Sequence, residues 1–136
     1  MQVSETVAEF LESPDRTNVL ATANAEGRVN AAVFGSPTLV DGDKIRLMLG
    51  DNRTYDNLNQ NPFAALFVTI QGKTGMAMEG CRLYLKMLDT ADEGPEFEAV
   101  HAEIKKRIGD ASSMLKHLVK LEVVETRPIL DFGQGV

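Results

Sequence analysis

Hydrophobic and polar residues alternate over short segments through much of the chain, which is the pattern of β-strands buried on one face. Residues 63–70 are almost all apolar, which is typical of a strand covered on both faces. Glycine-containing turns separate the segments, and Asp41-Gly42-Asp43 is a strong hairpin signal. We expect about six strands, drawn from residues 18–23, 28–34, 38–40, 44–49, 63–70, 76–89 and 118–125.

Other segments have helical spacing. An N-terminal helix is expected after Ser4, which can cap it, and a short helix is expected to end at Pro62, because the residue before a proline avoids helical angles. The best-defined helix covers residues 95–108, with a proline suited to its first position and basic residues in its last turn. Its buried stripe is expected to be Phe97, Val100, Ile104 and Ile108. Residues 127–136 are expected to form a tail.

The chain of 136 residues has the size of one domain, residues 1–136, and 43% of it is hydrophobic. Closely spaced antiparallel strands with helices outside the sheet predict a mainly β fold, a small barrel with peripheral helices. The formal net charge of -6 argues against nucleic acid as a partner, because such binding needs clustered Lys and Arg. The absence of a long apolar run or a signal sequence predicts a cytoplasmic protein that does not interact with a membrane.

The most informative segment for function is 50–58, where a strand leads through Gly50 into a helix start. Backbone N–H groups in the first turn of a helix have no partner, and the helix dipole is positive there. A positive side chain, Arg53, is unfavourable at that end unless an anion is bound nearby, and Thr54 adds a hydroxyl group. Two interpretations follow: a phosphate cradle, or a surface turn in which Arg53 pairs with Asp51 or Asp56.

Other chemistry finds little support in the sequence. His101 and His117 are expected to be packed or surface residues, and with one cysteine at no standard spacing they form no zinc site. Cys81 lies in the middle of a predicted strand, where a buried and inert thiol is expected. No residue is singled out as catalytic, so redox or group-transfer chemistry would have to come from a cofactor.

Three segments together resemble the FMN-binding split-barrel family, which includes pyridoxamine 5′-phosphate oxidase and small bacterial FMN-binding proteins. They are residues 19–30, residues 49–62 with Leu49-Gly50-Asp51-Asn52-Arg53-Thr54, and residues 94–100. The resemblance implies a six-stranded antiparallel split β-barrel, FMN as cofactor and a homodimer with the flavin between the subunits.

The resemblance also implies roles for individual residues. Arg53 and Thr54 would hold the FMN phosphate, with Leu49 and Gly50 beside it, and Gly50 would let the backbone approach. Asn30, Ala31 and Ala32 would lie along the isoalloxazine ring and offer backbone hydrogen bonds. Thr74 and Gly75 match a segment that approaches the flavin in relatives, although the oxidases have glutamine where this chain has Gly75.

The function implied is that of an FMN-binding flavoprotein, either an electron carrier with a protein redox partner or an oxidoreductase acting on a small molecule. Pyridoxamine 5′-phosphate oxidase activity is the enzymatic alternative, but the chain lacks the tryptophan and the C-terminal substrate residues of those oxidases; only Arg127-Pro128 is similar. The non-enzymatic alternative is a module that binds haem or a deazaflavin, or a sensor, on the same barrel.

Overall fold

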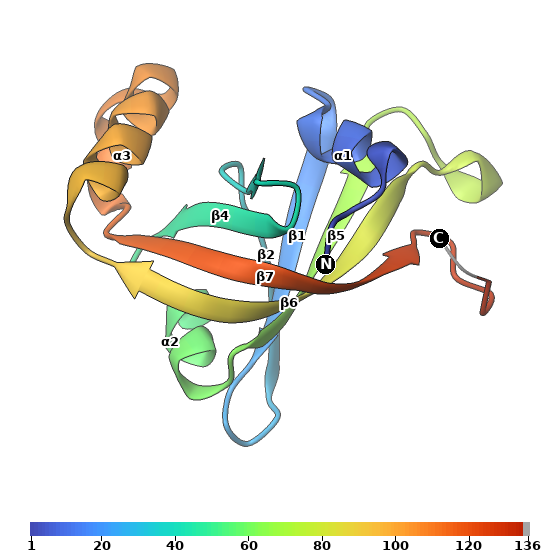
Figure 1. Cartoon of the computed structure of the whole chain (residues 1–136), viewed down its shortest axis with the longest axis horizontal. Helices are drawn as coiled ribbons and strands as arrows, with labels where there is room; N and C mark the ends of the chain where they lie inside the picture. The colour runs from blue at the N-terminus through green and yellow to red at the C-terminus, as the bar shows by residue number, and fades with distance from the viewer. Residues whose placement is uncertain (135–136) are drawn as a thin grey trace.

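The computed structural model describes residues 1–134 and consists mainly of one antiparallel sheet with helices around it (Figure 1). All seven expected segments form strands, which is one more than the expected total of about six, and segment 38–40 pairs with β4 as the hairpin signal at Asp41-Gly42-Asp43 predicted. In chain order the elements are α1 (Glu5–Glu12), β1 (Arg16–Ala23), β2 (Val29–Val33), β3 (Thr38–Val40), β4 (Lys44–Leu49), α2 (Arg53–Gln60), β5 (Phe63–Ile70), η1 (Gly75–Ala77), β6 (Gly80–Ala91), α3 (Pro95–Ile108), η2 (Gly109–Met114) and β7 (His117–Pro128).

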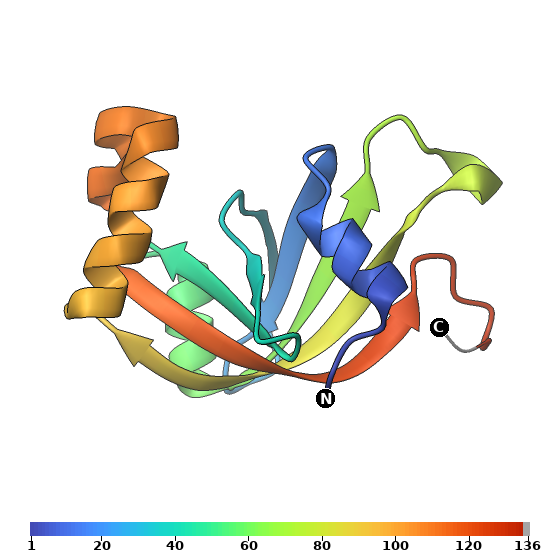
Figure 2. The ribbon, with the colours of Figure 1, turned by 45° about the horizontal axis from the view of Figure 1, so that its top comes forward.

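The sheet curves strongly but does not close. Its strand order is β2-β1-β5-β6-β7-β4-β3, and every neighbouring pair is antiparallel. The two edge strands, β2 and β3, do not pair with each other, so the barrel is split between them. Figure 2 shows the curved sheet from the side, with α1 lying over its concave face and α3 standing at one end.

The interior of the barrel is filled by aliphatic side chains. Alternate residues of β1, β5, β6 and β7 face inward, as the period of two along a strand requires. The expected N-terminal helix forms as α1 and contributes to the same core through Val7 and Leu11. The fully buried leucines of the strands are Leu20, Leu47, Leu49, Leu66, Leu83, Leu85 and Leu121.

Helix α3 has the predicted bounds but not the predicted burial. Of its apolar stripe only Ile104 is fully buried, against Met48 and Leu118, while Phe97 and Val100 pack partly and Ile108 is half exposed. The reason is that α3 packs against the end of the barrel rather than along it, so only one turn reaches the core (Figure 2). No helix within residues 1–134 is long and apolar enough to cross a membrane.

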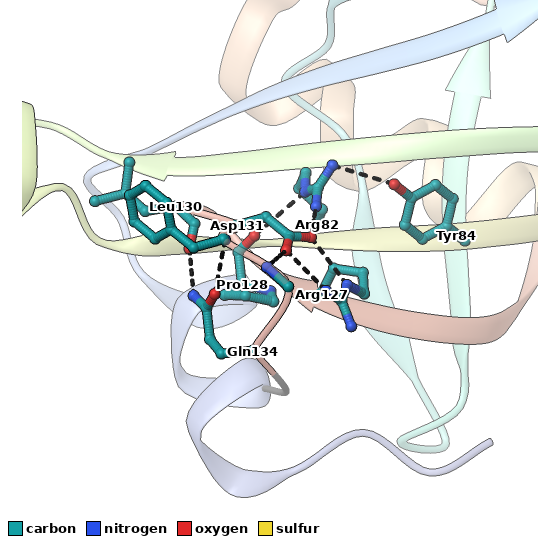
Figure 3. Close-up of polar contacts among 9 residues, drawn as sticks. Arg82, Tyr84, Arg127, Pro128, Leu130, Asp131 and Gln134 are labelled. Atoms are coloured by element: carbon teal, nitrogen blue, oxygen red, sulfur yellow. Dashed lines mark hydrogen bonds and ion pairs between the residues drawn. The ribbon is translucent and has the colours of Figure 1, made fainter.

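The C-terminal segment is tied to the sheet rather than free. Strand β7 continues through Arg127 and Pro128, beyond the predicted end at residue 125, because these residues pair with the start of β6. The chain then turns back, and the carboxylate of Asp131 accepts hydrogen bonds from both Arg82 and Arg127, as Figure 3 shows. The pKa of Asp131 is lowered to about 2, mainly by the hydrogen bonds from Arg127 and then by the backbone N–H of Gly133. Residues 135 and 136 of the predicted tail lie outside the described residues.

Gly80 is the position where the fold most needs a glycine. Its φ is 145°, and a Cβ atom there would lie 1.9 Å from the carbonyl oxygen of Val68 on the neighbouring strand. The strand β6 therefore begins at Gly80, not at Met76 as the hydrophobic pattern predicted, and residues 75–77 form a 3₁₀ turn before it.

We predict that Gly80→Ala lowers the free energy of unfolding by at least about 2 kcal/mol, because it adds both backbone strain and a clash with a strand backbone that cannot move freely. Gly35→Ala is the matched control, because its Cβ meets no atom within 4 Å and its φ is not in the left-handed region. Urea denaturation measures both variants. Equal stability of the two would contradict the steric argument.

Candidate functional site

Helix α2 begins with a cap that leaves two backbone donors free. The side chain of Asn52 accepts a hydrogen bond from the Tyr55 N–H at 2.9 Å, and the Asn52 carbonyl accepts one from Asp56. Arg53 and Thr54 are the first two residues of the helix, and their backbone N–H groups have no hydrogen-bond partner within residues 1–134. The start of α2 therefore presents unpaired donors together with the positive end of the helix dipole.

A polar hollow of about 250 Å³ lies beside α2, between the helix and the β1–β2 turn. Arg53 and Arg28 both line it, and neither has an acidic partner within 4.0 Å in the part of the chain that the structure describes. The interpretation in which Arg53 pairs with Asp51 or Asp56 is therefore wrong. The other residues of the hollow are Asn24, Val29, Asp56, Asn57 and Gln60.

Buried polar contacts hold α2 against the first two strands. Asn30 donates to the hydroxyl of Thr54 at 3.4 Å, which joins two of the predicted site residues across β2 and α2. Asn57, which is buried, donates to the Thr22 hydroxyl at 3.1 Å. Because these amides and hydroxyls are paired inside the structure, the helix is held in one position relative to β2.

The other residues predicted for the flavin site near α2 have small or buried side chains, so they would offer a ligand mainly backbone groups. Ala31 and Ala32 lie on opposite faces of β2, whose outer edge pairs with no strand and so offers free backbone groups. Leu49 is fully buried in the core. A Cβ atom on Gly50 would lie 2.6 Å from the carbonyl oxygen of Met114, so close approach of the chain itself explains this glycine.

Thr74 and Gly75 are not part of this group in the protomer. They lie in the connection between β5 and β6, at the end of β5 that is opposite to α2 (Figure 1). A strand of eight residues such as β5 spans about 26 Å, at roughly 3.3 Å per residue. The structure thus joins Asn30 to Thr54 by a hydrogen bond, with Arg53 at the start of the same helix. Gly50 packs against Met114 instead, and Thr74 and Gly75 lie apart from this group.

A histidine that the sequence did not single out supports the turn before α2. The two ring nitrogens of His117 lie 2.6 Å from carboxylate oxygens, Nε2 from Asp51 and Nδ1 from Asp92. The ring also stacks on Tyr55, with centroids 3.6 Å apart and planes 1° from parallel. Since ionised carboxylates only accept hydrogen bonds, both ring nitrogens must donate, and the group that fits is the imidazolium ion.

The charge of His117 depends on two opposing effects. Burial favours the neutral ring and lowers the pKa of His117, but the hydrogen bonds to Asp92 and Asp51 outweigh it and raise that pKa above its usual value. The same bond to His117 holds the pKa of Asp51 below its usual range, with Lys116 adding to the effect. The turn that leads into α2 is therefore held by a charged network.

Arg28 and His117 were not assigned to the site from the sequence, because both reach it only through contacts distant in sequence. Arg28 follows the turn glycine Gly27 and reaches α2 only because the hairpin folds back on the helix, while His117 meets Asp51 across 66 positions and Asp92 across 25. Tyr55, three residues after the cap Asn52, is an aromatic residue close to the site in sequence.

We predict that His117→Gln reduces stability more at pH 6 than at pH 9. The folded pKa of His117 is raised, so its contribution is complete below the unfolded pKa of about 6.5 and is lost as pH rises through the folded pKa. Chemical denaturation of wild type and variant across this range measures the effect. Parallel stability curves would show that the imidazolium does not form.

The comparisons with known proteins report on the fold. No protein-family model matches the chain, and no curated protein sequence matches it either. The structure is similar to an FMN-binding protein from Syntrophomonas wolfei, with a TM-score of 0.79 and 20% identity over 93% of this chain and 85% of that one. It is similar to HupZ of Group A Streptococcus, with a TM-score of 0.79 and 18% identity over 99% of both chains. It is also similar to HutZ, the heme storage protein of Vibrio cholerae, with a TM-score of 0.65 and 18% identity over 94% of this chain and 95% of that one. The chain therefore has the fold of the FMN-binding split-barrel family, as its three sequence segments predicted.

Proposed function

We propose that the protein is an FMN-binding flavoprotein whose phosphate site lies at the start of α2. The observation that carries this proposal is the pair of arginines, Arg28 and Arg53, that line one hollow and form no ion pair within 4.0 Å in residues 1–134, although Asp56 also lines it. Two like charges close together are stabilised by an anion, and a guanidinium matches the geometry of phosphate oxygens. The free N–H groups of Arg53 and Thr54 add donors of the kind found at helix phosphate sites.

The ring would lie along β2 from this phosphate site. Asn30 stands next to Thr54, and the outer edge of β2 has backbone donors and acceptors for the polar side of a flavin. When bound, FMN would supply the electron- or hydride-transfer chemistry. The role of this chain is to bind the phosphate, orient the ring beside β2 and hold the α2 turn through His117.

Haem is a weaker fit, although one neighbour is named as a heme storage protein. Both ring nitrogens of His117 are hydrogen-bonded to carboxylates, and Nε2 of His101 lies 2.9 Å from the Ser112 carbonyl oxygen. Cys81 is buried, and burial raises the pKa of its thiol to about 12. An axial ligand from these residues would have to break existing contacts, whereas Arg28 and Arg53 at the α2 hollow have no ion pair to break within residues 1–134.

Pyridoxamine 5′-phosphate oxidase activity is also less favoured. It requires a second basic site for the phosphate of the substrate, and Arg127 is the C-terminal residue that resembles one. In this chain the Arg127 guanidinium is bound to Asp131, as is that of Arg82 (Figure 3). We therefore propose FMN binding with either an electron-transfer role or an oxidoreductase activity on another small molecule.

A homodimer is part of the proposal. The outer face of β2, β1 and β5 carries exposed apolar residues, and the strand register places Val33, Val19 and Phe67 in one row and Ala31, Ala21 and Ala65 in the next. Val29 is 79% exposed, Val33 68% and Phe63 57%. A contiguous apolar surface of this kind is typical of an interface. Because Thr74 and Gly75 lie far from α2, they would have to reach a flavin from the second subunit.

The phosphate assignment predicts that FMN binds more tightly than riboflavin, and that Arg53→Ala weakens FMN binding by roughly 1.5–3 kcal/mol, the range for a hydrogen bond to a charged group. Titration calorimetry with FMN, riboflavin and FAD measures this. Lys105→Ala on α3 is the control, because that residue does not line the α2 hollow. Equal affinity for FMN and riboflavin would reject the phosphate site.

The dimer prediction is tested at the apolar face. Phe63→Lys should shift the protein toward monomer, because it places a charge in the proposed interface. Phe132→Lys is the matched control, since Phe132 is 77% exposed but lies in the C-terminal segment. Sedimentation velocity over a dilution series, with and without FMN, gives the state of each variant. Wild-type protein that stays monomeric when saturated with FMN would contradict the shared site.

A further inference from the structure

His117 joins two segments that are far apart in the sequence, and it does so beside the proposed phosphate site. Its Nε2 atom lies 2.6 Å from a carboxylate oxygen of Asp51, in the turn that leads into α2. Its Nδ1 atom lies 2.6 Å from a carboxylate oxygen of Asp92, in the segment before α3. The ring stacks on Tyr55 in the first turn of α2, and Asp51 comes two residues before Arg53. A change in the charge of this ring therefore acts at the start of α2.

Two negative and two positive groups meet in this network while the ring is protonated. The carboxylates of Asp51 and Asp92 face the ring from two different segments, and their charges favour the imidazolium ion. Lys116, next to His117 in the chain, forms an ion pair with the other carboxylate oxygen of Asp51 at 3.5 Å. When the imidazolium loses its proton, the network is left with one net negative charge beside α2.

The neutral ring can satisfy only one of the two carboxylates, because a neutral imidazole has one N–H donor and one acceptor nitrogen. Within residues 1–134 Asp92 has no ion-pair partner besides His117, whereas Asp51 also pairs with Lys116. We therefore expect the remaining proton to stay on Nδ1, toward Asp92, so that Asp51 faces the lone pair of Nε2. A cavity of about 400 Å³, which Asp51 and Lys116 both line, gives the released carboxylate room to move.

We propose that His117 is a positioning residue for the phosphate site at α2, and that loss of its ring proton weakens anion binding there. The inference rests on the proposed function, because it concerns the regulation of the same site. A released Asp51 carboxylate lies near the positive end of the helix dipole, where it repels a phosphate and competes for the free N–H groups of Arg53 and Thr54. The imidazolium prevents this by holding Asp51 through a charge-assisted hydrogen bond.

The pH range of this effect follows from the pKa of His117. Burial lowers this pKa, and the hydrogen bonds to Asp92 and Asp51 more than offset the effect of burial, so the pKa is raised above its ordinary value of about 6.5. Anion binding should therefore weaken as pH rises through the folded pKa. A phosphate monoester already carries most of its second negative charge above about pH 6.5, since its second pKa is about 6, so its own ionisation does not weaken binding there.

Calorimetric titration with FMN and with riboflavin, between about pH 6.5 and about pH 9.5, tests the proposal because the two ligands share the ring and differ in the phosphate. The ratio of FMN affinity to riboflavin affinity should fall roughly two- to fivefold as pH rises, which is the effect of one charge at a helix end. The midpoint of this fall should coincide with the titration of the His117 ring signals in NMR spectra. Because linkage is reciprocal, bound FMN should move the NMR titration to higher pH.

These titrations separate the inference from the function on which it rests. FMN that binds no better than riboflavin at any pH would reject the phosphate site itself, and the inference with it. A preference for FMN that stays constant across the pH range, or that changes without a matching titration of His117, would overturn only the inference.

Variants at the two ends of the Nε2 hydrogen bond give different expectations. In Asp51→Asn, whose altered side chain is exposed, the preference for FMN should no longer fall with pH, because there is no carboxylate to release. His117→Gln should show, at every pH, the weaker preference of the wild type at high pH. Glu93→Gln is the matched control for a lost negative charge, because Glu93 is exposed, adjoins Asp92 and forms no ion pair in the described part of the chain. The inference is overturned if Asp51→Asn keeps the wild-type pH dependence, or if Glu93→Gln removes it as well.

Discussion

The constraint on which the rest of this structure depends is the filled interior of a barrel that is not closed. Inward side chains of β1, β4, β5, β6 and β7 are buried and form the continuous apolar core of the barrel. A small barrel whose interior is occupied by side chains can bind ligands only on its outside, at its ends or along its open edges. In this chain the open edges are β2 and β3, and the α2 hollow lies beside the β1–β2 turn.

Pairs of arginines on this surface differ in whether an acidic side chain forms an ion pair with them. Arg82 and Arg127 face each other across β6 and β7, and Asp131 from the following segment neutralises them. Arg28 and Arg53 line the α2 hollow together with Asp56, but neither forms an ion pair within 4.0 Å in residues 1–134. In a chain with a net charge of -6, acidic residues are plentiful, so a pair of arginines that forms no ion pair supports the proposed anion site at α2.

The α2 turn is supported from two sides. On one side Asn30 and Thr22 form hydrogen bonds with residues of the helix, and on the other the stacked and doubly hydrogen-bonded ring of His117 holds Asp51. Such supporting contacts keep a binding group in position without touching the ligand. They also connect the turn to the start of β7 and, through Asp92, to the segment before α3.

The sequence by itself determined the strands, helix 95–108 and the phosphate hypothesis at Arg53, because hydrophobic period, helix caps and turn glycines act over a few neighbouring residues. It also determined the split-barrel fold, through a resemblance of short segments. Tertiary structure alone decided what depends on contacts distant in sequence: the exposure of Ile108, the partners of His117, the second arginine at the α2 hollow and the separation of Thr74 from it. The physical reason is that charges and hydrogen-bonding groups find their partners by position in space, which local patterns do not encode.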